Sequence, residues 1–218
     1  MMRGDDPPLF DVDDVLTERE LAAEAAEALT PTGGQRRPDL DAARLWLSRE
    51  DGLLVRGVKP HSASKSLLVS RSVDTVSSAM SGKWFASKHG LEYLELYSGP
   101  GRLLNERTGD EQLGSPLQAL RVAKPFSRYV FSDFSDDCVK ALSTRVGILA
   151  EVSVLQGDAN DHAHLARLGE LLNPRALVIA YLDPPRPQDL HWSTVEYLAS
   201  HLGFIDLIIN CPVNSLMR

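Results

Sequence analysis

The feature that most constrains the fold is an alternation, from residue 84 onward, of short apolar runs with segments typical of capped helices. The apolar runs are residues 91–97, 128–132, 152–155, 176–182 and 205–209. The helical patterns between them are residues 115–123, 135–146, 161–172 and 193–202. Such an alternation builds βαβ units, whose strands are parallel and whose helices cover both faces of the sheet. The sequence therefore predicts an α/β fold, a three-layer sandwich around a mostly parallel sheet.

The first 80 residues have a different character, and we interpret them as an N-terminal extension that is partly disordered and otherwise helical. An acidic, proline-containing start is followed by a capping box that opens an alanine-rich helix at 17–29. We expect a second helix at 39–50, ended by Gly52, and short strands at 53–58 and 67–69. This gives two units, residues 1–80 and residues 81–218.

A glycine turn, residues 98–101 (Ser-Gly-Pro-Gly), directly follows the first strand of the α/β part. Glycines there let the backbone approach a ligand, because no Cβ stands in the way, and Glu95 lies four residues before Gly99. Leu104 stands where a dinucleotide fingerprint needs its third glycine. The turn thus favours a smaller, adenosine-type ligand over NAD. The alternative is a tight connection without a ligand.

Acidic residues follow the next two strands. Asp133 is placed where a carboxylate accepts hydrogen bonds from both ribose hydroxyls. Asp158, after Gly157, repeats the logic and suits an adenine amino group. Each also has a structural alternative: helix capping for Asp133 and an Asx-type turn for Asp158. Together with Glu95, these two residues give three acidic strand ends, which favour a ligand more than any one of them does.

Asp183, Pro184 and Pro185 end the most apolar strand. Paired prolines fix the backbone and stop the strand, which holds the aspartate and nearby carbonyls in place. A rigid acceptor at this position is suited to orienting an amino group. The alternative is a strand that is simply terminated by proline.

Composition excludes several classes of protein. The chain has 218 residues, 43% of them hydrophobic and 24% charged, which is typical of a soluble domain. Its net charge of −7 argues against avid non-specific nucleic-acid binding, although a local basic groove stays open. Cys138, Cys211 and the scattered histidines form no metal-ligand spacing, and hydrolase or phosphate-loop motifs are absent. No apolar run spans a bilayer. We expect a cytoplasmic protein with no metal and no membrane association.

With these residues in view, the chain resembles Rossmann-like S-adenosylmethionine-dependent methyltransferases. More narrowly, residues 81–218 are similar to the three-Cys-motif partner (TcmP) family, through Trp84 with Lys88-His89, residues 98–102, 114–116 (Gly-Ser-Pro), 182–184 with Trp192, and 212–215 (Pro-Val-Asn-Ser) with Arg218. The resemblance implies S-adenosylmethionine as cofactor. It also implies a three-Cys-motif protein as partner and leaves the acceptor open, with nucleic acid as one candidate.

The implied roles divide the strand ends into three groups. The methionine portion would be held by Glu95, Ser98, Gly99 and Gly101, the ribose by Asp133, the adenine by Asp158, and the acceptor would face Asp183, Pro184 and Pro185. In this arrangement, the alignment of nucleophile, methyl group and leaving sulfur matters more than acid–base chemistry.

Two departures from that pattern keep an alternative open. Base-modifying amino-methyltransferases usually carry an aromatic residue after the double proline, where this chain has Arg186. The sheet also ends at residues 205–209, an apolar strand that needs a cover. The alternative is a catalytically inactive, methyltransferase-like protein that acts by association in a nucleic-acid-modifying system. A third hypothesis is another nucleotide-dependent enzyme on the same scaffold.

Overall fold

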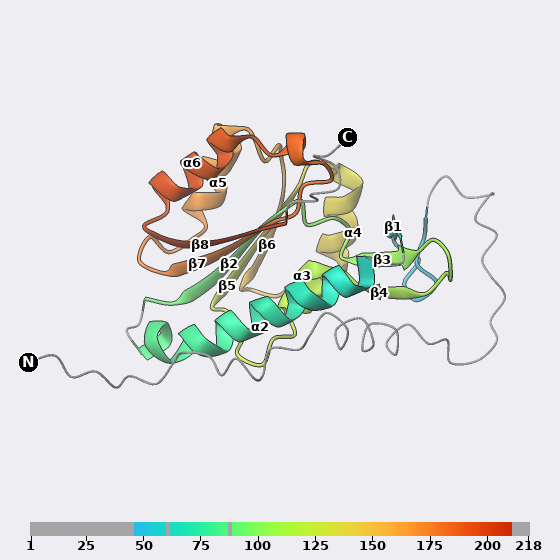
Figure 1. Ribbon diagram of the computed structural model, residues 1–218, viewed down its shortest axis with the longest axis horizontal. Helices are drawn as coiled ribbons and strands as arrows, with labels where there is room; N and C mark the ends of the chain where they lie inside the picture. The colour runs from blue at the N-terminus through green and yellow to red at the C-terminus, as the bar shows by residue number, and fades with distance from the viewer. Residues whose placement is uncertain (1–45, 60–61, 87–88, 211–218) are drawn as a thin grey trace, which may run out of the picture.

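A five-stranded parallel sheet is the centre of the molecule (Figure 1). The structure, a computed structural model, describes residues 46–59, 62–86 and 89–210. The strands are β2 (Leu91–Leu96), β5 (Arg128–Asp133), β6 (Val152–Gln156), β7 (Leu177–Leu182) and β8 (Phe204–Ile209). Their spatial order is β6-β5-β2-β7-β8, with every neighbouring pair parallel. The chain therefore builds outward from β2 in one direction, then crosses over to build β7 and β8. Between β2 and β7 lies a topological switch point, where open α/β sheets bind ligands.

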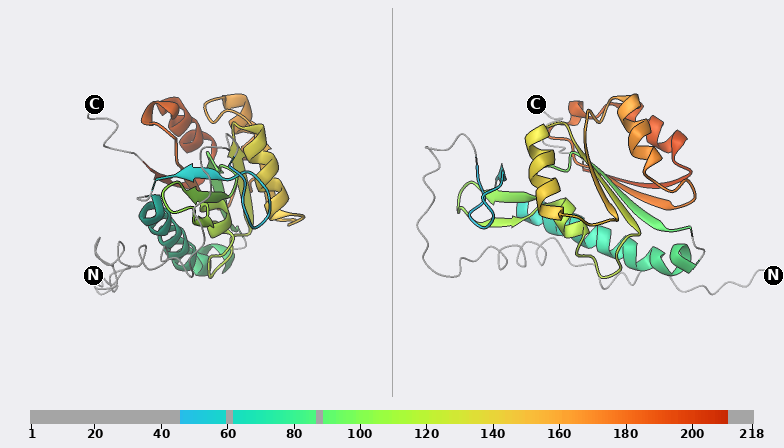
Figure 2. Two further views of the ribbon diagram at one scale, coloured as in Figure 1. Left: turned by 90° about the vertical axis from the view of Figure 1, so that its right-hand side faces the viewer. Right: turned by 180° about the vertical axis from the view of Figure 1, so that it is seen from behind.

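Helices cover both faces of this sheet (Figure 2). On one face lie α2 (Ser62–Ala86), α3 (Ser115–Ala119) and α4 (Asp136–Val146); on the other lie α5 (His162–Glu170) and α6 (Trp192–His201). Each face has its own hydrophobic core, and every residue of β2 and β7 is buried. The predicted three-layer α/β fold with a parallel sheet is confirmed.

The five strands of the main sheet and the helices α4, α5 and α6 lie close to where the apolar runs and helical patterns predicted them. Ser135 accepts a hydrogen bond from the Cys138 N–H, and Asp161 accepts one from the Ala163 N–H, so both side chains cap their helices. The main difference is α3, which ends at Ala119 instead of extending to residue 123.

A second, three-stranded sheet lies beside the main one; its strand β1 falls within the strand predicted at 53–58, whereas its other two strands were not predicted. β1 (Arg56–Val58) pairs in parallel with β3 (Arg102–Asn105), which pairs in antiparallel fashion with β4 (Glu111–Leu113). β3 and β4 are inserted between the glycine turn and α3. We call residues 46–58 together with α2 the N-terminal layer, because both parts pack onto elements that come later in the chain.

The structure corrects two predictions in this layer. The helix predicted at 39–50 is wrong over its described residues, 46–50. Leu47 instead bridges Leu54, the Ser48 N–H donates to the carbonyl of Leu53, and the chain reverses at Gly52, whose φ is 71°. An Asp-Gly pair is a strong turn signal, and it dominates over the helical spacing that precedes it.

The strand predicted at 67–69 is also wrong, because these residues lie inside α2. The helix packs on the sheet through apolar side chains spaced three or four residues apart: Val69, Val73, Val76, Met80 and Trp84. The serines between them hide this periodicity in the sequence. The boundary predicted near residue 80 falls within α2, and the division of the chain into two units stays a prediction.

Several other predictions fall outside the described residues. These are the disordered start, the helix at 17–29, Lys88, Cys211 and the motif at 212–215 with Arg218.

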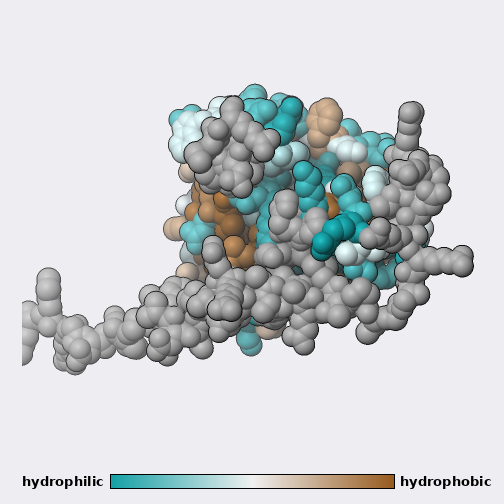
Figure 3. All heavy atoms as spheres, turned by 45° about the vertical axis from the view of Figure 1, so that its right-hand side comes forward, coloured by the Kyte–Doolittle hydropathy of each residue, from teal (hydrophilic) through white to brown (hydrophobic). Residues whose placement is uncertain are grey.

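β8 is the last strand of the main sheet in the described part of the chain, where only β7 pairs with it. Its end residues Phe204 and Ile209 are 53% and 39% exposed, and the ring of Trp84 lies 5.2 Å from that of Phe204. Figure 3 shows one face of the molecule, on which a hydrophobic patch stands among mostly hydrophilic side chains. Among the described helices, none is both long enough and apolar enough to cross a membrane.

Candidate functional site

Two adjoining cavities lie at the carboxyl edge of the main sheet. The first, of about 390 Å³, lies between the glycine turn, α2 and the end of β7, and we call it the turn cavity. The second, of about 470 Å³, is lined by Asp133, Asp158 and Asp189, and we call it the acidic cavity. Arg56, Tyr97 and Pro185 line both. The two cavities thus adjoin at these three residues, which we call their shared middle, and we call the two cavities together the depression.

The glycine turn has a backbone that only particular residues tolerate. Gly99 and Gly101 have φ angles of 64° and 87°, and Tyr97 before them has the left-handed value of 68°. A Cβ on Gly101 would lie 2.8 Å from Leu142 Cδ1. Left-handed φ at a non-glycine residue is uncommon and costs conformational energy, which often marks a functional site.

Asp133 is joined directly to this turn. Its Oδ2 accepts a hydrogen bond of 2.7 Å from the Gly99 N–H, and its Oδ1 accepts one of 2.9 Å from the Ser135 N–H. The Arg56 guanidinium lies 3.5 Å from Oδ2. The structure therefore brings the end of β5, the turn and β1 together at the middle of the depression. Asp133 does not cap α4, whose N-cap is Ser135, but its bond to the Ser135 N–H orders the loop before that helix.

Ser98 carries an observation that points to a ligand. The residue is 6% exposed and lines the turn cavity, yet its Oγ has no hydrogen-bond partner among the described residues. A buried hydroxyl without a partner is costly. Together with the cradle left by the missing side chains of Gly99 and Gly101, this hydroxyl fits a polar ligand resting on the turn.

Glu95 lies behind the cavity wall rather than in it. The side chain is fully buried, accepting hydrogen bonds from the hydroxyls of Ser115 at 2.5 Å and Tyr93 at 3.1 Å. Burial raises the pKa of Glu95 to about 8, more than these bonds lower it. Because Ser115 lines the turn cavity, Glu95 reaches the cavity surface through that hydroxyl, and its direct contact with a ligand stays a prediction.

Asp158 lies in the acidic cavity but also forms the predicted Asx turn, accepting a hydrogen bond of 2.8 Å from the Asn160 N–H. The preceding Gly157 is required by packing, since a Cβ there would lie 2.2 Å from the His164 ring. That ring is fully buried. Arg167 can only donate to its Nδ1, so Nε2 carries the proton and donates to Ser132 Oγ. His164 thus packs beneath the ends of β5 and β6 and holds them in place.

Asp183 has partners that the sequence did not reveal. The Lys65 ammonium, from α2, lies 2.6 and 2.8 Å from its two carboxylate oxygens, and the Asn210 amide donates to Oδ1 at 2.7 Å. Pro184 and Pro185 line the turn cavity beside it. Burial and the nearby carboxylate charge of Asp183 raise the pKa of Tyr181, which keeps that phenol neutral. Asp183 thus lines the turn cavity with both of its carboxylate oxygens bonded to a lysine.

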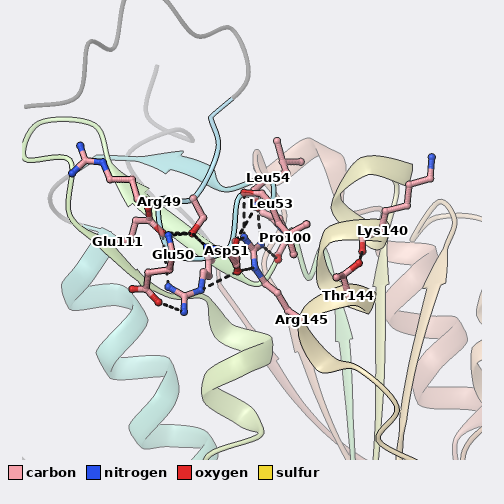
Figure 4. A network of polar contacts seen from close by, with 12 residues as sticks. Arg49, Glu50, Asp51, Leu53, Leu54, Pro100, Glu111, Lys140, Thr144 and Arg145 are labelled. Carbon is pink, nitrogen blue, oxygen red and sulfur yellow. Dashed lines mark hydrogen bonds and ion pairs between the residues drawn. The ribbon is translucent and has the colours of Figure 1, made fainter.

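One buried arginine fastens the N-terminal layer to the glycine turn (Figure 4). The Arg145 side chain, from α4, is 4% exposed and binds both carboxylate oxygens of Asp51, at 2.8 and 2.9 Å. Its guanidinium also donates to the carbonyls of Leu54 and Pro100, at 2.6 and 2.5 Å. The guanidinium holds the pKa of Asp51 far below its usual range. This Arg145 clamp fixes the segment that leads into β1, and so positions Arg56.

The structure therefore brings most predicted residues to one depression: Ser98, Gly99, Gly101, Asp133, Asp158, Asp183, Pro184 and Pro185 line its two cavities. Glu95 does not line either of them. Sequence reasoning missed Arg56 and Lys65, because each lies far along the chain from the strand ends it contacts. Asn210 was missed as well, although it follows β8 as the aspartates follow their strands and could have been found by the same strand-end rule. Within the described ranges, no group of His, Cys, Asp and Glu is placed to hold a metal ion.

Comparison with known proteins adds a distant likeness. No protein-family model and no curated protein matches the chain. Among solved structures, one from Pyrococcus horikoshii, described as a "putative RNA methyltransferase", is similar at 13% identity with a TM-score of 0.39. The alignment covers 89% of this chain and 73% of that one. A likeness this distant says nothing about activity, and the fold assignment rests on the sheet order and the helix layers.

Proposed function

We propose that the chain is an S-adenosylmethionine-binding, methyltransferase-like protein of the three-Cys-motif partner type, with an acceptor still to be identified. The observation that carries the proposal is the shared middle of the two cavities, where Asp133 accepts the N–H of Gly99. This contact holds a carboxylate that suits ribose hydroxyls directly beside a turn whose backbone a ligand can approach.

The chemistry of the two cavities fits the two ends of such a ligand. The acidic cavity offers carboxylates, which accept hydrogen bonds from ribose hydroxyls and from an amino group such as that of adenine. The turn cavity offers the partnerless Ser98 hydroxyl, two glycines and the cations Arg56 and Lys65. An amino-acid portion, which carries a carboxylate, suits this second set of groups.

When bound, S-adenosylmethionine supplies an electrophilic methyl group. The residues of the chain would act by positioning. Asp183, fixed between β7 and two prolines, would accept a hydrogen bond from an amino acceptor in exchange for one of its present partners. Asn210 would keep the carboxylate in place. An acceptor that needs both oxygens must displace Lys65.

The narrower assignment, to the three-Cys-motif partner type, has support from how the described motif residues lie. The N–H of Gly114 donates to the carbonyl of Gly101 at 2.8 Å, which joins the 114–116 motif to the glycine turn. A Cβ on Gly114 would lie 3.1 Å from that backbone, which is tighter than an ordinary contact, so glycine favours this close approach. The Trp84 and His89 rings lie 6.5 Å apart at the start of β2. A three-Cys-motif protein as partner and nucleic acid as acceptor belong to the same proposal.

A second function is favoured by the occupied state of Asp183. A carboxylate held by Lys65 and Asn210 is what a protein that binds the ligand without transferring a methyl group would retain. In that case the protein would act by association in a nucleic-acid-modifying system. Asp183→Ala separates the two functions: it would abolish the cellular effect of a methyltransferase and leave that of a binding partner intact.

Calorimetric titration of the full chain with S-adenosylmethionine tests the main proposal. We expect saturable binding with one site per chain, and binding that Asp133→Ala weakens at least about 10-fold, because that variant removes a charged hydrogen-bond acceptor. A folded wild-type protein that binds neither S-adenosylmethionine nor S-adenosylhomocysteine would overturn it.

A further inference from the structure

Resting on that proposed function, we propose that Arg56 recognises the ligand's carboxylate and leaves Asp133 to do so. The N-terminal layer would then contribute a specificity-determining residue to the cofactor site. The residue lies 43 positions before the glycine turn at Gly99, outside the strand-end motifs that form the rest of the site.

The position of Arg56 is the first argument. It lines both cavities, and its side chain is 39% exposed, so it reaches the ligand space and is not sealed beneath it. A Cβ on Gly99 would lie 3.1 Å from the Arg56 Cζ, so the guanidinium rests directly on the glycine turn. The pairing of β1 with β3 and the Arg145 clamp on Leu54 hold the backbone on either side of it.

The present partner of Arg56 is the second argument. Its ion pair with Asp133 is long, at 3.5 Å, and joins one guanidinium nitrogen to one carboxylate oxygen. That oxygen already accepts the shorter bond from the Gly99 N–H. Arg56 therefore has N–H groups that Asp133 does not use, and the position of Asp133 does not depend on Arg56. Ribose hydroxyls that take Asp133 would release the guanidinium for a second anion.

The distribution of charge says where that anion would lie. The acidic cavity contains three carboxylates, Asp133, Asp158 and Asp189, against two arginines, Arg56 and Arg186. Arg186 is paired with Asp189 at 2.6 Å, so the remaining carboxylates, Asp133 and Asp158, disfavour a second anion there. The turn cavity contains Arg56 and Lys65 among its described lining residues, and Lys65 is bonded to both oxygens of Asp183. Arg56 is the cation with capacity left, and its planar fork matches a carboxylate.

The experiment compares two ligands that differ in the amino-acid portion. S-Adenosylhomocysteine carries the carboxylate, and 5′-methylthioadenosine has the same nucleoside without it. Both are titrated into the full chain as wild type, Arg56→Gln, Arg56→Lys and the control Arg49→Gln. Arg49 is an exposed arginine of the same layer, so its variant makes the same change of charge.

We expect Arg56→Gln to weaken S-adenosylhomocysteine about 10-fold or more, the usual effect of losing a charge-assisted bond. Methylthioadenosine should stay within about twofold of wild type, and so should both ligands with Arg49→Gln. Arg56→Lys keeps the charge but not the fork, so we expect an intermediate loss. If Arg56→Gln does not fold, Arg56→Lys carries the test, with a loss confined to the ligand that has a carboxylate.

Other results overturn the inference. An equal loss of both ligands would mean that Arg56 acts through Asp133 or through folding. Unchanged ligand binding with weakened binding of a single-stranded oligonucleotide would mean that Arg56 contacts an acceptor phosphate. Wild-type protein that binds neither small molecule would remove the proposed function, and this inference with it. Wild type that binds both ligands equally well would remove the inference alone.

Discussion

The strand ends of the main sheet and the N-terminal layer both line the same depression, but they do so by different means. The strand ends supply it through local sequence: a short apolar run, then glycine, proline or aspartate at the next position. The layer supplies it through contacts across many residues, such as Lys65 with Asp183 and Arg145 with Asp51. We call the strand ends of the main sheet the floor of the site and the N-terminal layer its wall. The floor is built into the sheet, whereas the wall is attached to it separately. The predictions below test whether floor and wall differ in stability as they differ in origin.

The largest expected effect is on the floor. In Gly157→Ala the new Cβ would overlap the His164 ring, which is buried and hydrogen-bonded on both nitrogens and so has nowhere to move. We expect the free energy of unfolding to fall by about 3 kcal/mol, the upper end of the usual cost of overpacking a core. The control is Gly82→Ala in α2, where nothing lies within 4 Å of the new methyl group. That variant should gain about 0.5–1 kcal/mol. Urea denaturation measures both, and similar values for the two would contradict the packing argument.

The next effect concerns the wall. Arg145→Ala removes a buried guanidinium and leaves Asp51 and the carbonyls of Leu54 and Pro100 without it. We expect the layer to lose about 2–3 kcal/mol of stability. Relative to wild type, amide hydrogen exchange should then speed up more at residues 51–58 than in β2 or β7. Lys140→Ala, on the same helix, breaks an exposed pair with Asp136 and should cost less than about 0.5 kcal/mol. Faster exchange spread evenly over the sheet would argue against a separate wall.

A pH effect is expected from Glu95, the buried acid in β2. The pKa of Glu95 is about 8 in the folded protein and about 4.3 in an unfolded chain. Between these values the folded state binds the extra proton, so stability falls as pH rises from about 4.5 to about 8. Glu95→Gln resembles the protonated acid, so its stability should not fall with pH in this range. Its free energy of unfolding at pH 8 should exceed that of wild type by more than about 1 kcal/mol. Denaturation at pH 5 and pH 8 checks it; a slope that persists in the variant would assign it to another group.

The smallest effect is expected for Lys65→Gln. Its ion pair with Asp183 is partly exposed, at 40% and 23% for the two side chains, so it should contribute no more than about 1 kcal/mol. Thermal denaturation measures the change. A loss above about 2 kcal/mol would show that this pair, rather than the apolar face of α2, anchors the layer to the sheet.

Sequence reasoning found the floor because parallel strands bring their carboxyl ends to one edge, so residues such as Asp133 and Asp158 are adjacent whatever their distance in the chain. The same rule has no counterpart for the wall. Nothing near Arg56 in the sequence shows that β1 pairs with β3, because that pairing depends on three residues in register and on Arg145 from another helix. The turn at Gly52 was missed for a local reason, since helical spacing before it was weighed above the Asp-Gly signal.

The Arg145 clamp has a consequence for affinity. Arg145 lines neither cavity, yet Arg56 can reach a ligand only while the clamp holds its strand in place. If the layer is closed in a fraction f of molecules, a ligand that needs Arg56 binds with an apparent Kd equal to the intrinsic Kd divided by f. Weakening the clamp then lowers affinity without changing any ligand contact. On the same proposal 5′-methylthioadenosine makes no contact with Arg56 and would not respond, so a change in the ratio of the two affinities would report a change in the closed fraction.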